Sequence, residues 1–169
     1  MASALPTTPW GWALRALRRS VQFRGRANRA EYWWFTAFSM VPGVVVSVLE
    51  GAGVEPQLLL NQVDTAISAL LLLPSFSAGV RRLHDVDRSG WWIGATLPLL
   101  LVWLLAIGFT DGGSGLQMLI LWGGLLGLLA YFVMALVWFT RPGTPGPNRF
   151  GENPLGLASD AERLAQDFA

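Results

Sequence analysis

The stretch LQMLILWGGLLGLLAYFVMALVWF, residues 116–139, contains no formally charged residue. A helix needs about 20 residues to cross the roughly 30 Å hydrocarbon core of a bilayer. We therefore predict a transmembrane helix here. A second uncharged stretch, WWIGATLPLLLVWLLAIGF, occupies residues 91–109 and predicts another span.

Two further apolar runs, 32–54 and 58–80, complete a set of four predicted spans. The run at 58–80 carries Asn61, Gln62 and Asp64 near its start, so its first turns are expected close to the membrane interface. The whole chain is 53% apolar and 14% charged and contains nine tryptophans, a composition unlike that of a soluble domain. We predict an all-α integral membrane protein, a four-transmembrane-helix bundle.

The distribution of arginine predicts the orientation of this bundle. The chain contains twelve arginines and no lysine. Six arginines precede the first predicted span, three lie between the second and third, and three follow the fourth. The loops around 50–57 and 110–115 contain none. Because basic loops stay inside the cell, both termini are predicted to be cytoplasmic.

Residues 1–22 have the pattern of an amphipathic helix lying in the cytoplasmic membrane interface. Thr8 and Pro9 suit the N-cap and the first helical position. The predicted apolar face consists of Trp10, Leu14, Leu17 and Val21, and the arginines turned away from it are Arg15, Arg18 and Arg19. Packing of this helix on the bundle, without lipid contact, is the alternative.

Residues 23–154 form the predicted transmembrane domain, and 155–169 a short cytoplasmic tail. Within the tail, Ser159 and Glu162 have capping-box spacing, which predicts a short helix.

Prolines and small residues indicate how the spans bend and pack. One proline lies in each of the first three spans, at positions 42, 74 and 98, and each predicts a kink. Gly123, Gly127 and Ala130 form a small-residue face on the fourth span, which permits close backbone approach. We expect that face to pack within the bundle, with a homodimer contact as the alternative.

The second span carries a polar stripe on one helical face, formed by Asn61, Asp64, Thr65 and Ser68. An ionisable residue within a membrane is costly, so Asp64 is a candidate for function in solute or ion transport. Its position near the outer end of the span favours snorkelling to the interface instead.

Three polar segments border the spans on the predicted cytoplasmic side: FRGRANRAEYWWF at 23–35, VRRLHDVDRSGWW at 80–92 and GPNRFGENP at 146–154. Together they resemble the signature of the domain of unknown function 805 family, the YhaH-like bacterial inner-membrane proteins. The resemblance runs from about residue 20 to residue 154. It implies a small four-helix protein of the bacterial inner membrane, with no established activity and no catalytic residues to carry over.

These segments predict a cytoplasmic polar cap formed by Arg24, Arg26, Asn28, Arg29, Glu31, Arg81, Arg82, His84, Asp85, Asp87, Arg88, Asn148 and Arg149. Arginines and carboxylates so close together are expected to pair with one another and with backbone carbonyls, which would dock the helix ends. We expect His84 to tie its loop to Asn148 and Arg149. Indoles at the headgroup boundary are expected to anchor the spans, namely Trp33, Trp34, Trp91 and Trp92.

The cap also supports functional hypotheses. Surplus arginines could bind anionic lipid headgroups or a partner protein, either cytoplasmic or in the membrane, which makes a non-enzymatic membrane module the leading interpretation. A metal-dependent enzyme at His84, Asp85 and Asp87 is an alternative, although adjacent residues rarely converge on one ion. The chain has no cysteine and no known catalytic motif. We therefore assign no catalytic residue, metal or cofactor, and expect no nucleic-acid partner.

Overall fold

The computed structural model describes residues 5–109 and 114–156. Residues 110–113 and the predicted tail helix at Ser159–Glu162 lie outside this description. Within the described ranges the chain forms helices and one isolated bridge between Asn148 and Gly151. The helices are α1 Pro9–Arg18, α2 Arg29–Gly51, α3 Gln57–Asp85, α4 Trp91–Gly94, α5 Thr96–Gly108 and α6 Gly115–Thr140.

Four helical segments are long and apolar enough to cross a membrane: Arg29–Gly51, Gln57–Asp85, Trp91–Gly108 and Gly115–Thr140. The predicted all-α membrane fold is confirmed. Two span limits shift. The helix α2 begins early because the Asn28 side chain caps it, accepting a 2.8 Å hydrogen bond from the Glu31 amide. The helix α3 continues to Asp85, so Arg81–Asp85 are helical and not part of the predicted loop.

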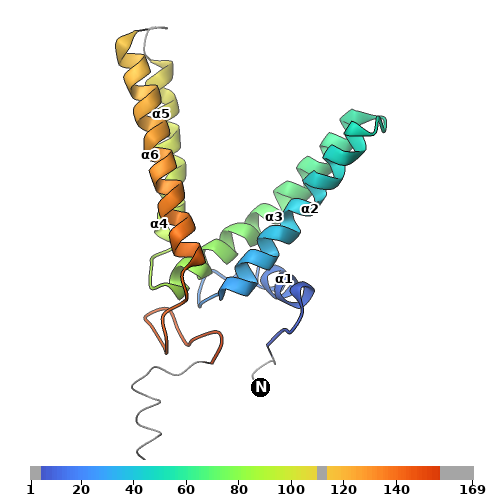
Figure 1. Ribbon diagram of the computed structural model, residues 1–169, viewed down its shortest axis with the longest axis vertical. Coiled ribbons are helices and arrows are strands. Elements are labelled where there is room, and N and C mark those ends of the chain that lie inside the picture. Colours follow the sequence, from blue (N-terminus) through green and yellow to red (C-terminus); the bar gives the residue numbers. More distant parts are fainter. Residues whose placement is uncertain (1–4, 110–113, 157–169) are drawn as a thin grey trace, which may run out of the picture.

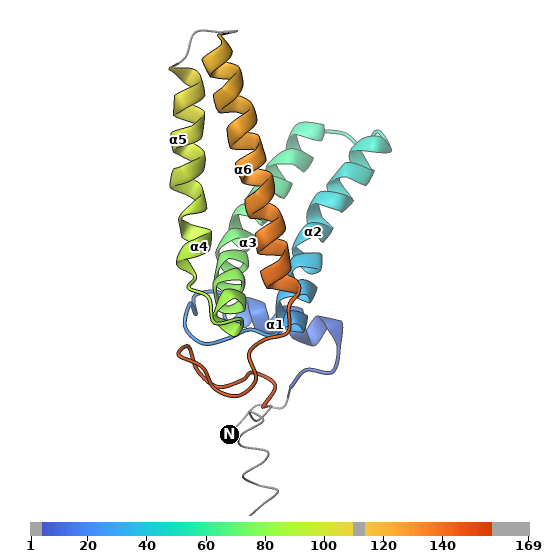
Figure 2. The same cartoon turned by 60° about the vertical axis from the view of Figure 1, so that its left-hand side comes forward.

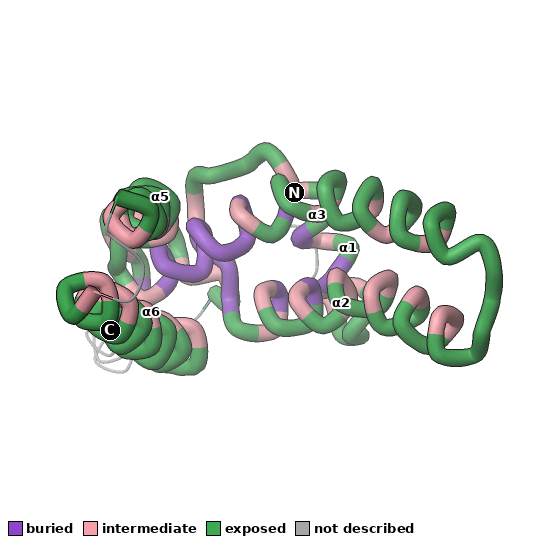
Figure 3. The backbone as a smooth tube through the Cα atoms, turned by 90° about the horizontal axis from the view of Figure 1, so that it is seen from above, coloured by how far each residue is buried: buried purple, intermediate pink, exposed green. Residues whose placement is uncertain are grey.

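The spans are arranged as two antiparallel hairpins, α2–α3 and α4/α5–α6 (Figure 1). The hairpins meet at one end and diverge toward the other, as both side views show (Figure 2). Buried residues gather at the shared end, whereas the outer halves of the hairpins are mostly exposed (Figure 3). The spans therefore pack in pairs, and their exposed apolar side chains are available to lipid.

The helix α1 lies across the shared end, beside the start of α2 (Figure 1). As predicted, Thr8 caps it, accepting a 3.1 Å hydrogen bond from the Gly11 amide, and Pro9 is its first residue. Its buried residues are Ala13 and Ala16, whose small side chains let α1 approach the hairpin closely.

Part of the predicted α1 face is wrong. The side chains of Trp10, Leu14 and Leu17 are exposed and available to lipid, as expected. Val21, however, lies beyond the helix. Arg15 and Arg19 do not point away, because their guanidinium groups reach the buried carboxylate of Glu31. The helix therefore packs on the hairpin through one face and exposes an apolar flank.

Two of the predicted prolines, Pro42 and Pro74, lie inside helices α2 and α3. Pro98 instead lies in the first turn of α5, where the third span is interrupted at Ala95. Proline has no N–H to donate to the carbonyl of Gly94, four residues earlier. The break between α4 and α5, at Ala95, lies directly after Gly94, whose carbonyl lacks this donor.

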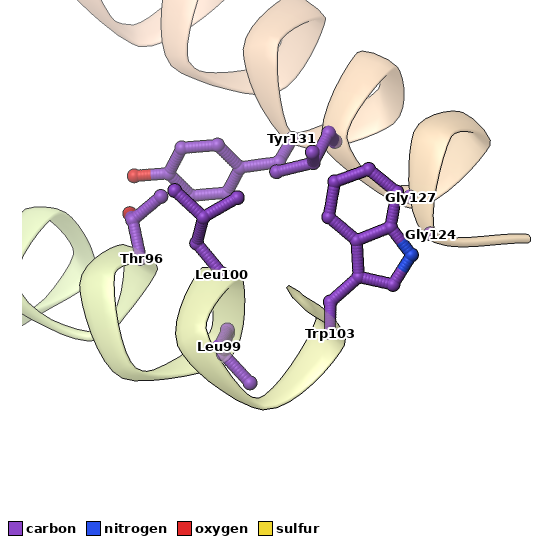
Figure 4. Close-up of a pocket in the computed structure, with 8 residues that line it drawn as sticks. Thr96, Leu99, Leu100, Trp103, Gly124, Gly127 and Tyr131 are labelled. Atoms are coloured by element: carbon purple, nitrogen blue, oxygen red, sulfur yellow. The ribbon is translucent and has the colours of Figure 1, made fainter. Parts of the chain in front are cut away.

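The hairpin α5–α6 encloses an apolar crevice of about 290 Å³, lined by Trp103, Gly124 and Tyr131 among others (Figure 4). The Trp103 indole fills the space over Gly124 and donates a 2.9 Å hydrogen bond to the carbonyl of Ile120. The expectation that the face of Gly123, Gly127 and Ala130 packs within the bundle is wrong, because all three residues are exposed. Apart from the helix's own backbone, no atom lies within 4 Å of a Cβ placed at Gly123 or Gly127. Gly124, not Gly123, permits the close approach.

Candidate functional site

The shared end of the hairpins contains the predicted polar cap, and much of it is buried. The buried polar residues are Arg26, Asn28, Glu31, Ser77, Arg81, Arg82, His84 and Asp85. Glu31, Arg81 and Arg82 are fully shielded from solvent, with 0% exposure. Burying charged groups is costly unless each finds partners. The partners divide the cap into two clusters.

The Asp85 cluster consists of Asp85, Arg26 and Arg82. One Asp85 oxygen, Oδ1, accepts a 2.9 Å hydrogen bond from Arg26 Nε, and the other, Oδ2, accepts one of 2.5 Å from Arg82 Nη1. A Cβ at Gly143 would collide with this carboxylate, so only glycine lets residues 141–146 approach it.

Backbone carbonyls accept the other donors of these two arginines. Arg26 donates to the carbonyls of Gly146 and Thr144, at 2.7 and 2.6 Å. Arg82 donates to the carbonyl of Phe139 at 3.1 Å and to that of Arg141. The cluster therefore ties the residues before α2, the end of α3 and the segment after α6. No buried side-chain nitrogen or oxygen of Arg26, Arg82 or Asp85 lacks a hydrogen-bond partner.

The Glu31 cluster contains one carboxylate and three guanidinium groups. Arg81 pairs with Glu31 Oε1, while Arg15 Nε and Arg19 Nη1 each lie 3.4 Å from Oε2. Burial lowers the pKa of Arg19 from its ordinary value; the charge of Glu31 opposes this, and those of Arg81 and Arg15 reinforce it. Arginine nevertheless stays protonated at neutral pH, so this cluster carries an excess of two positive charges.

Buried side-chain donors without a partner gather at the Glu31 cluster. Within the described residues, five buried side-chain nitrogen or oxygen atoms have no hydrogen-bond partner. Three belong to arginines of the Glu31 cluster, namely Arg15 Nη1, Arg81 Nε and Arg81 Nη2. A fourth is Nδ2 of Asn28, the N-cap residue of α2. None belongs to the Asp85 cluster. The two clusters therefore differ. The Asp85 cluster has one excess positive charge and no unpartnered buried donor, whereas the Glu31 cluster has two excess positive charges and unpartnered donors.

His84 connects segments of the cap, although not in the way predicted. Its Nδ1 lies 3.1 Å from the carbonyl of Gly25, and its ring stacks on Phe150 with centroids 3.9 Å apart. The contact with Asn148 runs through the backbone, because Asn148 Nδ2 donates to the His84 carbonyl at 2.9 Å.

The residues of the metal hypothesis do not converge. Asp85 is held by two arginines, while Asp87 pairs at the surface with Arg149 at 3.0 Å. In the described part of the chain no three histidine or acidic side chains are placed to hold a metal ion. The geometry gives the enzyme alternative no support.

Other predicted members lie at the rim of the cap. Arg24, Arg29, Arg88 and Arg149 are exposed. The guanidinium of Arg88 lies 5.2 Å from the Trp138 ring centre. The predicted anchors Trp33, Trp34, Trp91 and Trp92 are also exposed. Trp33 in addition links the hairpins, since its Nε1 donates to the carbonyl of Phe139 at 3.3 Å.

The polar stripe of α3 lies away from the cap. Asn61, Thr65 and Ser68 are exposed, and the Thr65 hydroxyl bonds its own helix at the Asn61 carbonyl. Asp64 turns toward α2, where its Oδ1 lies 3.7 Å from a Cβ placed at Gly43. The four residues therefore share a helix face without jointly lining one enclosed path.

Several residues of the cap escaped the sequence analysis. Arg15 and Arg19 were assigned to the outward face of α1, and the hydroxyl of Ser77, which donates to the carbonyls of Arg19 and Gln22, was not considered. The spacing of Arg15 and Arg19, four residues apart beside Ala16, was the available signal. No sequence signal identifies Thr144 and Gly146, because they contribute backbone carbonyls.

A family model described as "Protein of unknown function (DUF805)" matches residues 20–152. The chain belongs to the DUF805 family. This confirms the resemblance carried by the three polar segments. The match includes Glu31, Arg81 and the Asp85 cluster, whereas Arg15 and Arg19 precede it.

Two inner membrane proteins of Escherichia coli (strain K12) are similar to this chain. The chain is 33% identical over 147 residues to the inner membrane protein YhaI, covering 85% of this chain and 94% of YhaI. It is 32% identical over 149 residues to the inner membrane protein YhaH, covering 85% and 95%. No solved structure matches the chain. With four candidate spans and these relatives, this DUF805 protein is an inner-membrane protein.

Proposed function

We propose that this protein is a non-enzymatic membrane module that binds anionic lipid headgroups at the cytoplasmic face of the inner membrane. The observation that carries the proposal is the position of α1, which lies across the shared end of the hairpins and exposes Trp10, Leu14 and Leu17 beside the spans. Apolar side chains at that level suit the headgroup boundary rather than a soluble partner.

The exposed arginines support the same proposal. Arg18, the last residue of α1, and Arg24, in the loop that follows, are exposed. Arginines near an anionic membrane surface each contribute on the order of 1 kcal/mol to binding. The arginines of the described residues lie in or beside the helix ends that meet at the shared end. Because basic residues favour the cytoplasmic side, we infer that this end and both termini are cytoplasmic.

Reporter fusions test this orientation. A reporter that is active only in the cytoplasm should be active when fused after Ala169, and inactive when inserted in the loop at 110–115. The opposite pattern would put the cap outside the cell, where the anionic cytoplasmic leaflet cannot reach it. A fusion with a reporter that is active only outside serves as the reciprocal control.

Reconstitution tests lipid binding. In nanodiscs that contain phosphatidylglycerol, the thermal unfolding midpoint should exceed that in pure phosphatidylcholine, because anionic headgroups bind the folded cap and stabilise it by mass action. Added salt should reduce the difference, since it screens exposed charges. Equal midpoints in the two lipids at low salt would contradict the proposal. Capture of a protein partner without any lipid preference would favour the partner alternative.

A further inference from the structure

Beside the Glu31 cluster lies a cavity of about 490 Å³, between α1, the loop at Gly25 and the segment around Asn153. Arg15, Arg19 and Arg26 line it, and Glu152 is its acidic lining residue. Arg15 and Arg19 thus belong both to the cavity wall and to the group of cations around Glu31. The cavity lies at the end of the molecule that we assign to the cytoplasmic face.

The donors at this cavity suit an oxyanion. Arg15 Nη1 has no hydrogen-bond partner but is closed to solvent, so a ligand reaches it after the guanidinium turns toward the cavity. Arg19 donates through Nε to Gln22 and through Nη1 to Glu31. Its Nη2 lies 3.4 Å from a Cβ placed at Gly25. Gly25 has a φ of +85°, which favours glycine, so the backbone turns there without a side chain between Arg19 and the cavity. Guanidinium groups bind phosphate through two parallel N–H donors, which is a geometry that a lone water does not reproduce.

The larger excess of positive charge and the unpartnered donors favour this cavity over the Asp85 cluster as an anion site. Arg26 already donates hydrogen bonds to the Asp85 carboxylate and to the carbonyls of Thr144 and Gly146. Around Glu31, in contrast, three guanidinium groups share one carboxylate, and Arg81, which is fully buried, keeps two nitrogens without partners. A second anion beside Arg15 and Arg19 would offset the excess positive charge.

We propose that this cavity is a binding site for a phosphate group, held by Arg15 and Arg19 with the charge of Arg81 behind them. The identification of the phosphate as part of a lipid headgroup rests on the proposed function. The site itself does not, because a soluble phosphate presents the same oxygen atoms. The experiment therefore uses both sources.

The test measures thermal unfolding of the full chain in a nonionic detergent free of phosphate. The probes are inorganic phosphate, phosphatidylglycerol added to the micelles, and sodium chloride at matched ionic strength. Phosphate or phosphatidylglycerol should raise the midpoint of the wild type, and chloride should not. Arg15→Gln should weaken binding of the effective probe by about tenfold or more, the effect of losing a charge-assisted hydrogen bond.

Arg18→Gln is the matched control, since Arg18 lies on the same helix but is exposed and outside the cavity. It should change the affinity for inorganic phosphate by less than about twofold, as expected for a surface charge outside the cavity. With phosphatidylglycerol, its effect should not exceed about fivefold, which corresponds to the roughly 1 kcal/mol of a general surface arginine. Glu152→Gln tests the site without disturbing a buried group. Removing its repelling charge should tighten binding by about twofold.

The outcomes separate the site from the proposed function. A response to phosphate alone that requires Arg15 supports the site and contradicts the lipid function. A response to phosphatidylglycerol that requires Arg15 supports both. A lipid response that Arg15→Gln and Glu152→Gln leave unchanged overturns the site and leaves the lipid function standing. No response to either probe overturns both.

Discussion

Asp85→Asn should lower the free energy of unfolding by about 3–5 kcal/mol, because it removes the only carboxylate from a buried cluster and leaves Arg26 and Arg82 without a counter-charge. Asparagine keeps the size of the side chain, so the loss reports charge rather than a cavity. Chemical or thermal unfolding of the purified protein in nonionic detergent measures it.

Asp87→Asn is the matched control. Asp87 lies two residues further along and also pairs with an arginine, but the side chains of Asp87 and Arg149 are 48% and 60% exposed. Exposed ion pairs contribute little, so we expect a loss of about 0.5 kcal/mol or less. A loss for Asp85→Asn as small as that for Asp87→Asn would show that the Asp85 cluster is not what holds the cap together.

Exchanging the charges of Arg82 and Asp85 should not restore stability, although simple pairing would predict that it does. Arg82 also donates to carbonyls at Phe139 and Arg141, which an aspartate at position 82 cannot do. An arginine at position 85 would, in addition, meet Arg26. The two residues should still show strong coupling in a double-mutant cycle, because they are in direct contact.

Glu31→Gln is the second variant expected to have a large effect. It leaves Arg15, Arg19 and Arg81 together without a carboxylate, so we expect the free energy of unfolding to fall by about 3–5 kcal/mol. The same unfolding measurement applies. If phosphate binds beside these arginines, its addition should recover part of the loss, because the anion replaces some of the missing charge.

Glu50→Gln, at the opposite end of the same helix, controls for the loss of a carboxylate from α2. Its effect should be within about 0.5 kcal/mol, as for most surface substitutions. Recovery of Glu31→Gln by sodium chloride to the same extent as by phosphate would indicate general screening and not a bound anion.

The spans could be predicted from the sequence because hydrocarbon thickness directly sets the length of an apolar run. The end of α3 could not, since Arg81 and Arg82 look like loop residues until their buried partners are known. The identity of the cap residues was predictable from their clustering near the span ends. Their division into two clusters was not, because it depends on backbone carbonyls such as that of Thr144 and on the inward turn of Arg15 and Arg19.

The divergence of the two hairpins bears on how the protein is made. Apolar surfaces of separate hairpins gain little from meeting in lipid, which solvates them equally well, so each hairpin can insert in the membrane by itself. The contacts that orient one hairpin against the other come last during synthesis, because Arg26 precedes its acceptor Thr144 by 118 residues. A nascent chain that has released α6 but not yet residues 141–146 therefore holds two hairpins joined by contacts at the end of α6, such as the Trp33–Phe139 bond, while Arg26 still lacks its carbonyl acceptors.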